Sequence, residues 1–262
     1  MTMWEAILLG IVQGLTEFLP VSSSGHLILV PRLMGWPDQG LAFDAAIHLG
    51  TLGALLAYFR TELRALATGE LSRRVALLVV VATLPAALAG LLLGGLIEAR
   101  LRSPLVVAAS TALWGVVMGI ADRRAPRPPE TPGDPLERIA WAQGLAVGLA
   151  QAVALIPGTS RSGITLTAGL FVGLDRATSA RFSFLLGLVV TGLAGAWETL
   201  KLARAGTVSV DWGPLAAAVV AAFASGWLAV WFLVSYLRRG SLLPFVVYRL
   251  LLAALILVVV LR

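Results

Sequence analysis

The sequence predicts an all-α integral membrane protein, an inverted-topology repeat with six transmembrane helices and two re-entrant helical hairpins. Composition is the first observation, because the chain is 58% hydrophobic and only 13% charged, whereas a soluble domain is about 25% charged. The second is that six apolar runs approach the roughly 20 residues that cross a bilayer. The third is a polar motif that occurs twice and interrupts two further apolar runs.

The duplicated motif begins at Gly10 in the first half and at Gly148, 138 residues later, in the second. The two stretches align without a gap and share the identical pairs Gly10/Gly148, Gln13/Gln151, Ser22/Ser160, Ser24/Ser162 and Gly25/Gly163. Each is an apolar helical stretch that breaks at a proline, Pro20 or Pro157, and continues into small polar residues. Broken hydrophobic segments at matching positions of two halves indicate a polar site near the bilayer midplane.

The remaining elements follow from the positions of the apolar runs. In chain order, the expected spans are Leu41–Phe59, Val75–Ile97, Pro104–Ile120, Phe182–Leu200, Gly213–Tyr236 and Leu243–Leu261. The two motifs fall outside these spans, within Met3–Met34 and Ala140–Leu174. A polar loop interrupts each of these segments, and such backbone survives at membrane depth only when it is buried in protein or lines a wet cavity. We therefore expect two re-entrant helical hairpins.

The number of spans between the hairpins predicts how the two halves are related. Three spans separate the hairpins, and because three is odd, the second hairpin enters the membrane from the opposite face. The chain is thereby divided into a first repeat at residues 1–121 and a second repeat at residues 139–262. The Pro- and Arg-rich residues 122–138 between them are interpreted as a disordered-looking cytoplasmic linker.

The distribution of basic residues predicts the orientation. One set of loops holds Arg60, Arg64, Arg73, Arg74, Arg123, Arg124, Arg127, Arg138, Arg176, Arg181, Arg238 and Arg239, and the other holds Arg32, Arg100, Arg102, Lys201, Arg204 and Arg262. Because cytoplasmic loops carry the excess of basic residues, the first set is expected in the cytoplasm, with both termini outside. The net charge of +6 is thus a topology signal, and we expect no nucleic-acid partner.

A carboxylate within the first hairpin is the main candidate for chemistry. Gln13 and Glu17 are four residues apart, so they share one helix face. A carboxylate at membrane depth is energetically expensive and indicates a functional site, and these oxygen donors suit a divalent cation such as Mg²⁺ or Ca²⁺. The alternative is that Glu17 pairs with Arg161 for structure alone. The chain has no cysteine, which excludes thiolate metal sites.

The serine runs predict an anion site. Each run precedes an apolar stretch and lies at the expected N-terminus of a half-helix, where free N–H groups and the helix dipole favour phosphate oxygens. The predicted diphosphate-binding residues are Ser22, Ser24, Gly25, Thr159, Ser160, Ser162 and Gly163. Arg161 takes the position that Ser23 holds in the first copy, and its planar fork matches phosphate geometry.

The two histidines of the chain receive different predictions. His26 follows Ser23 by three residues and could act as a general base, a general acid or a nucleophile. His48 lies inside a span, far in sequence from the serine runs. We therefore expect it to be a hydrogen-bonded structural residue or a group that contacts the site residues without reaching the substrate. Two other polar residues of the spans remain open: Arg249 is interpreted as structural or interfacial, and Asp44 as a helix cap or a support of the site.

Together these residues carry a resemblance to a known family. Residues 13–26, QGLTEFLPVSSSGH, and residues 157–163, PGTSRSG, resemble the two signature motifs of the undecaprenyl-diphosphate phosphatase family of the bacitracin-resistance type. Residues 43–50 and 182–186 resemble further conserved blocks of that family. The active-site positions of the family fall on Glu17, Ser23, Ser24, His26, Ser160 and Arg161. Gln13 stands where many members carry a second glutamate.

The resemblance implies a metal-dependent enzyme of the bacterial inner membrane whose site opens to the outer face. It implies hydrolysis of undecaprenyl diphosphate to the monophosphate, which recycles the lipid carrier for peptidoglycan synthesis and confers bacitracin resistance. The nucleophile is left open among Ser23, His26 and water. The expected partners are the polyprenyl diphosphate lipid and the bilayer, and a homodimer is allowed for.

Two other functions share part of this pattern. A polyprenyl-phosphate transporter or flippase would share the inverted repeat and the midplane site, but it needs no acid–base pair such as Glu17 and His26. A type-2 phosphatidic-acid phosphatase would share the Ser-Gly-His element, but the chain lacks the later histidine element of that family.

Overall fold

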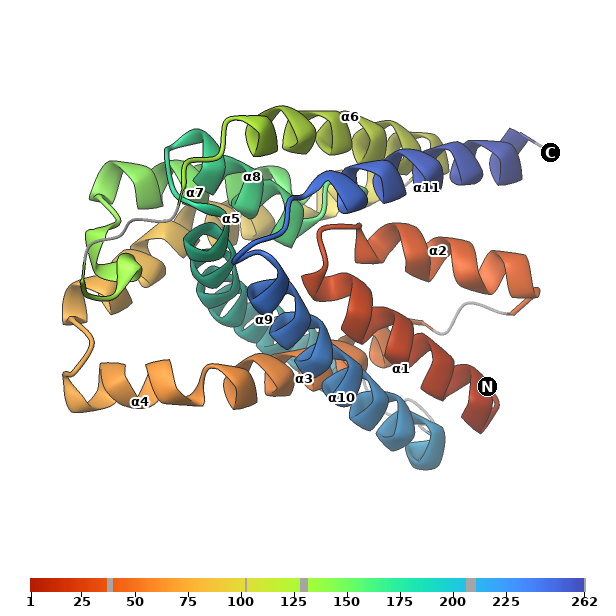
Figure 1. Cartoon of the computed structure of the whole chain (residues 1–262). Coiled ribbons are helices and arrows are strands. Elements are labelled where there is room, and N and C mark those ends of the chain that lie inside the picture. Colours follow the sequence, from red (N-terminus) through yellow and green to blue (C-terminus); the bar gives the residue numbers. More distant parts are fainter. Residues whose placement is uncertain (37–39, 102, 128–131, 206–210, 262) are drawn as a thin grey trace.

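A computed structural model describes residues 1–36, 40–101, 103–127, 132–205 and 211–261. All regular structure in this part of the chain is helical (Figure 1). The elements are α1 Met3–Phe18, α2 Ser23–Met34, α3 Gly40–Tyr58, α4 Arg60–Thr68, α5 Arg73–Leu101, α6 Pro104–Arg123, the 3₁₀ helix η1 Pro135–Arg138, α7 Trp141–Val153, α8 Arg161–Phe171, α9 Arg176–Ala205, α10 Trp212–Tyr236 and α11 Leu243–Leu261. Residues 128–131 of the predicted linker, and Arg102 and Arg262 of the charge pattern, lie outside the described residues.

Several of these helices identify a multi-pass membrane protein. Five described segments are long and apolar enough to cross a bilayer: Arg73–Ile97, Pro104–Arg123, Arg176–Trp197, Trp212–Tyr236 and Leu243–Leu261. They correspond to five of the six predicted spans. The remaining predicted span, Leu41–Phe59, falls on α3. Its apolar stretch Phe43–Tyr58 is shorter than the five segments above.

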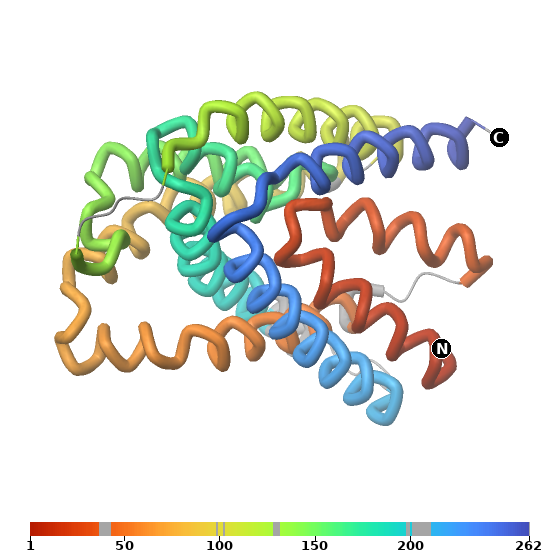
Figure 2. The backbone as a smooth tube through the Cα atoms, in the orientation of Figure 1, coloured from red at the N-terminus to blue at the C-terminus, as the bar shows by residue number. Residues whose placement is uncertain are grey.

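Both predicted hairpins are helix–break–helix segments. α1 and α2 have 16 and 12 residues, and α7 and α8 have 13 and 11. At 1.5 Å per residue these helices are roughly 16 to 24 Å long, which is shorter than the roughly 30 Å hydrocarbon core. Figure 2 shows that the turn between α1 and α2 points toward the middle of the molecule. Each of these helices is therefore too short to cross the hydrocarbon core alone.

Corresponding helices of the two halves pack in corresponding ways. α1 packs on α10 while α7 packs on α5, and α3 contacts α10 while α9 contacts α5; α6 and α11 lie side by side (Figure 1). The repeated glycine explains two of these contacts. A Cβ on Gly10 would lie 2.3 Å from the carbonyl oxygen of Ala218, and one on Gly148 would lie 2.0 Å from that of Ala82. Only glycine allows such close helix approach.

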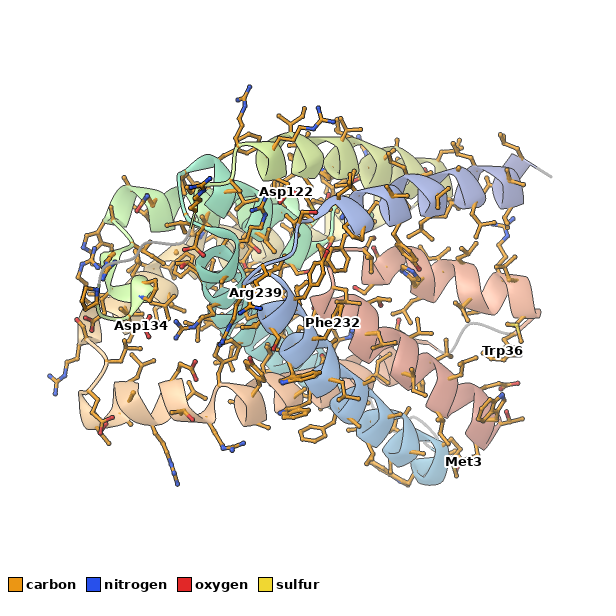
Figure 3. All side chains as sticks on the ribbon, in the orientation of Figure 1. Met3, Trp36, Asp122, Asp134, Phe232 and Arg239 are labelled. Carbon is orange, nitrogen blue, oxygen red and sulfur yellow. The ribbon has the colours of Figure 1, made fainter. Side chains whose placement is uncertain are left out.

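The linker is partly ordered, so the prediction of a disordered-looking segment is wrong for its last residues, which form η1. Asp134 caps this helix by accepting from the Leu136 N–H, and its carboxylate also accepts two hydrogen bonds of 3.0 Å from Arg181 on α9. Burial alone would raise the pKa of Asp134, but these hydrogen bonds hold that pKa below its ordinary value. Figure 3 places Asp134 at the end of the molecule opposite Met3 and Trp36.

Candidate active site

The tips of the two hairpins meet. The Gly158 N–H donates to Ser24 Oγ at 3.2 Å, and the Ser162 hydroxyl donates to the Leu19 carbonyl at 3.3 Å. Each tip therefore reaches into the backbone turn of the other. The sequence repeat predicted this meeting, because two inverted hairpins would bring their breaks to the same depth.

Both turns adopt the same uncommon backbone conformation. Ser22 has φ 76° and Ser160 has φ 69°, and they are the non-glycine residues with positive φ in the described part of the chain. Such a conformation costs about 1–3 kcal/mol and is concentrated at functional sites. Each serine also caps its half-helix, since its Oγ accepts from the N–H of Gly25 at 3.4 Å or Gly163 at 3.2 Å.

The other predicted phosphate-binding hydroxyls shape the tips. Ser24 and Ser162 hold the opposite turn, as described above, and the buried Thr159 hydroxyl pairs with Ser110 Oγ at 2.9 Å. The first N–H groups of α2 and α8 have no partner within their own helices. Anion binding at these two helix starts stays a prediction.

Arg249 connects the two hairpin tips through hydrogen bonds. Its side chain is fully buried and donates to the carbonyl oxygens of Thr111, Pro20, Gly158 and Thr159 at 3.0–3.3 Å. Thr111 precedes Arg249 by 138 residues, which is also the separation between Pro20 and Gly158. Arg249 therefore lies where the two halves meet, and of the two predicted roles the structure favours the structural one.

Glu17 is the centre of the polar cluster. One carboxylate oxygen, Oε2, accepts from the Ser23 hydroxyl at 3.1 Å and from Gln13 Nε2 at 3.3 Å. The other, Oε1, lies 3.3 Å from Arg161 Nη2. The side chains of Glu17 and Arg161 are only 10% and 12% exposed. The first repeat thus supplies a hydroxyl and a carboxylate to this site, and the second repeat supplies a guanidinium. The ion pair between Glu17 and Arg161, which the sequence offered as an alternative to a functional role, is present.

Arg161 keeps a hydrogen-bond donor for a further anion. Its Nη1 donates to the Ser183 carbonyl at 3.4 Å, while its buried Nε has no hydrogen-bond partner among the described residues. The side chain occupies a space that exists because Gly187 has no side chain, since a Cβ there would lie 2.1 Å from Arg161 Nη1. An unpaired buried N–H is costly, so a phosphate oxygen at this position would stabilise the arrangement.

The structure does not bring His26 to Glu17. Its Nδ1 lies 2.7 Å from the Ser22 carbonyl, which can only accept, so Nδ1 carries the hydrogen. In the neutral ring, Nε2 then accepts from the Tyr248 hydroxyl at 2.6 Å, and the two rings are stacked. His26 therefore supports the turn at Ser22, and its direct role in catalysis stays a prediction.

His48 is hydrogen-bonded, as the sequence predicted, and it also lies beside Glu17. Its Nε2 lies 4.0 Å from Glu17 Oε2, and its side chain is 37% exposed. Its Nδ1 donates to the Asp44 carbonyl at 2.6 Å, one turn earlier in α3. One signal could have found it: a histidine inside a membrane span indicates a functional site by the rule that singled out Glu17.

The donors around Glu17 fit a divalent cation. Gln13 is fully buried, and its Oε1 has no hydrogen-bond partner in the described part of the chain. Amide and carboxylate oxygens are the ligands that Mg²⁺ and Ca²⁺ take in proteins. Among the described residues no group of three or more His, Cys, Asp and Glu side chains could hold a metal. A cation here would therefore complete its shell with water and phosphate oxygens, as Mg²⁺ commonly does.

Comparison with known proteins identifies a family for this chain. The family described as bacitracin resistance protein BacA matches residues 6–255. The undecaprenyl-diphosphatase 2 of Stutzerimonas stutzeri (strain A1501) is 48% identical, covering 98% of each chain. The undecaprenyl-diphosphatase of Nitrosococcus oceani is 47% identical over 95% of each chain, and that of Teredinibacter turnerae is 44% identical over 99% of this chain and all of its own. The chain belongs to the bacitracin resistance protein BacA family.

Proposed function

We infer that this protein is an integral membrane phosphatase that hydrolyses undecaprenyl diphosphate to undecaprenyl phosphate and inorganic phosphate. The observation that carries the inference is the contact of Glu17 with both the Ser23 hydroxyl and the Arg161 guanidinium. A nucleophile, a base and an anion-binding group at membrane depth match a phosphorylated substrate that resides in lipid. The family and the printed names of its relatives point to the same reaction.

The diphosphate binds between the two tips in this proposal. The starts of α2 and α8 supply backbone N–H groups and the positive ends of two helix dipoles. Arg161 contributes its unpaired Nε–H and the planar fork that matches phosphate oxygens. Arg249 positions both turns through their carbonyl groups.

Ser23 is the nucleophile that the geometry supports best. Its hydroxyl already donates to Glu17, so the carboxylate can accept the proton as Oγ attacks the terminal phosphorus. The bond between that phosphorus and the bridging oxygen breaks, and undecaprenyl phosphate leaves. Water then attacks the phosphoserine, inorganic phosphate departs, and Ser23 Oγ regains a proton. A divalent cation, Mg²⁺ or Ca²⁺, held by Glu17 and Gln13, would neutralise negative charge on the diphosphate.

The finer membrane layout belongs to the same proposal. The protein lies in the bacterial inner membrane with six spans, two re-entrant hairpins, both termini outside and the site open to the outer face. The short hairpin helices support this layout. So does the position of both chain ends at one end of the molecule (Figure 1), opposite Asp134 (Figure 3). The excess of basic loop residues on one side supports this orientation.

A transport function is less well supported. A flippase needs an anion site and two alternating openings, but it needs no hydroxyl in contact with a base. The contact between Ser23 and Glu17 therefore favours an enzyme.

The test is release of inorganic phosphate from undecaprenyl diphosphate by the purified protein in detergent, with and without a chelator. We expect release that the chelator abolishes and that Ser23→Ala lowers strongly. Movement of polyprenyl phosphate across vesicles without phosphate release would support the transporter instead.

A further inference from the structure

The contact between His48 and Glu17 is not a hydrogen bond. Nε2 of the histidine and Oε2 of the carboxylate are 4.0 Å apart, beyond the range of about 2.7–3.2 Å for a hydrogen bond between nitrogen and oxygen. The Nδ1 hydrogen is used by the Asp44 carbonyl, so Nε2 of the neutral ring carries a lone pair. Two electron-pair donors therefore face each other without a hydrogen between them.

Gln13 lies beside the same carboxylate. Its Nε2 contacts the same Glu17 oxygen at 3.3 Å, and its buried Oε1 has no hydrogen-bond partner among the described residues. Buried acceptors without partners are destabilising. A positively charged ion bound beside Glu17 would give Gln13 Oε1 the partner that it lacks.

We propose that His48 Nε2 is a ligand of the divalent cation that the proposed function requires, together with Glu17 and Gln13 Oε1. Two ligands that each lie about 2.1 Å from one ion are at most about 4.2 Å apart, and the observed 4.0 Å satisfies that limit. Histidines that bind metals almost always donate their other ring N–H to a carbonyl or carboxylate. His48 does so to Asp44.

The nitrogen ligand predicts which cation this chain prefers. Imidazole suits transition-series ions, while carboxylate and amide oxygens suit Mg²⁺, Ca²⁺ and Mn²⁺. A set with one imidazole, one carboxylate and one amide oxygen therefore favours Mn²⁺ over Ca²⁺. The 37% exposure of the histidine side chain leaves room for water or phosphate oxygens on the same ion.

The experiment measures Mn²⁺ bound to the metal-stripped, purified protein in detergent. Electron spin echo envelope modulation detects ¹⁴N bound to the manganese, and titration followed by electron paramagnetic resonance gives the affinity. The chain has two histidines, so His48→Gln is the test variant and His26→Gln the matched control. We expect an imidazole nitrogen signal in the native protein and in His26→Gln. In His48→Gln the signal should vanish and the affinity should fall at least about tenfold.

Three results would overturn the inference: no Mn²⁺ binding, a nitrogen signal that survives in His48→Gln, or a signal lost only in His26→Gln. The phosphate-release assay separates this outcome from failure of the proposed function. Chelator-sensitive release without a nitrogen signal would refute the His48 ligand and leave the phosphatase intact. A nitrogen signal without phosphate release under any divalent cation would refute the phosphatase and leave the ligand intact.

Discussion

Arg161 Nη2 lies 3.3 Å from Glu17 Oε1, although the two residues are 144 positions apart in the chain. The carboxylate comes from the end of α1, and the guanidinium from the start of α8. Each side chain is almost buried, so neither charge would be stable at this depth without the other. The pair joins the two repeats and places their polar groups in a single site.

Removing the charge of Glu17 tests its role as a base. Glu17→Gln keeps the size of the side chain and an oxygen that can accept from Ser23, so the fold should survive. It removes the group that takes the Ser23 proton, and kcat for phosphate release should fall at least about a hundredfold, within the range for lost acid–base catalysis. Size-exclusion chromatography of the variant checks its folding. Near-native turnover in a well-folded sample would refute the assignment.

Replacing Arg161 by lysine separates charge from shape. Arg161→Lys retains a positive charge beside Glu17 but loses the planar fork and the free Nε–H. We expect phosphate release to stay strongly impaired, by at least about tenfold. If lysine restored full activity, simple charge compensation of Glu17 would be the better explanation.

The space beside Gly187 can be filled without replacing any of the residues assigned to the site. In Gly187→Ala the new Cβ would lie 2.1 Å from Arg161 Nη1, so the guanidinium must leave its present position. The matched control is Gly192→Ala on the same helix, where the nearest atom would be 3.9 Å away. The activity of Gly187→Ala should fall at least about tenfold, while that of the control stays within about twofold. Equal activities in the two variants would mean that Arg161 needs no fixed position.

Arg249 should affect the stability of the tips. Arg249→Met removes the guanidinium donors to the buried Pro20 and Thr159 carbonyls, while Gly158 keeps its hydrogen bond from the Thr111 hydroxyl. Each buried carbonyl left unpaired costs about 1–3 kcal/mol. We expect a clear drop in the midpoint of thermal unfolding in detergent. Arg239→Met, at an exposed arginine, is the control and should change stability by no more than about 0.5 kcal/mol. Equal unfolding midpoints for the two variants would mean that Arg249 does not stabilise the tips.

The sequence predicted the parts of the molecule that are encoded locally. Repeated serines after a proline mark a helix break and a cap, so the turns at Ser22 and Ser160 were foreseeable. Helix α4 was missed because the prediction relied on apolar runs long enough to cross a bilayer, and this nine-residue helix is too short and too polar to be one. It begins at Arg60, where the apolar run of α3 has ended.

The missed functional contacts depend on tertiary packing. His48 reaches Glu17 only because α3 packs beside α1. Arg249 reaches both turns only because α11 lies against α6 where the tips meet. Neither relationship has a sequence spacing that could reveal it. Gly187 is a further example. It leaves room for the Arg161 guanidinium, and only the packed structure shows this.

A double-mutant cycle on Glu17 and Arg161 tests most directly whether the two repeats form one catalytic site. It compares kcat/KM for phosphate release by Glu17→Gln, Arg161→Met and the double variant. Residues that act as a unit are strongly non-additive, so the double variant should be no more than about threefold slower than the worse single variant. Losses that multiply in the double variant would mean that the two residues act independently, and they would contradict a site shared between the hairpin tips.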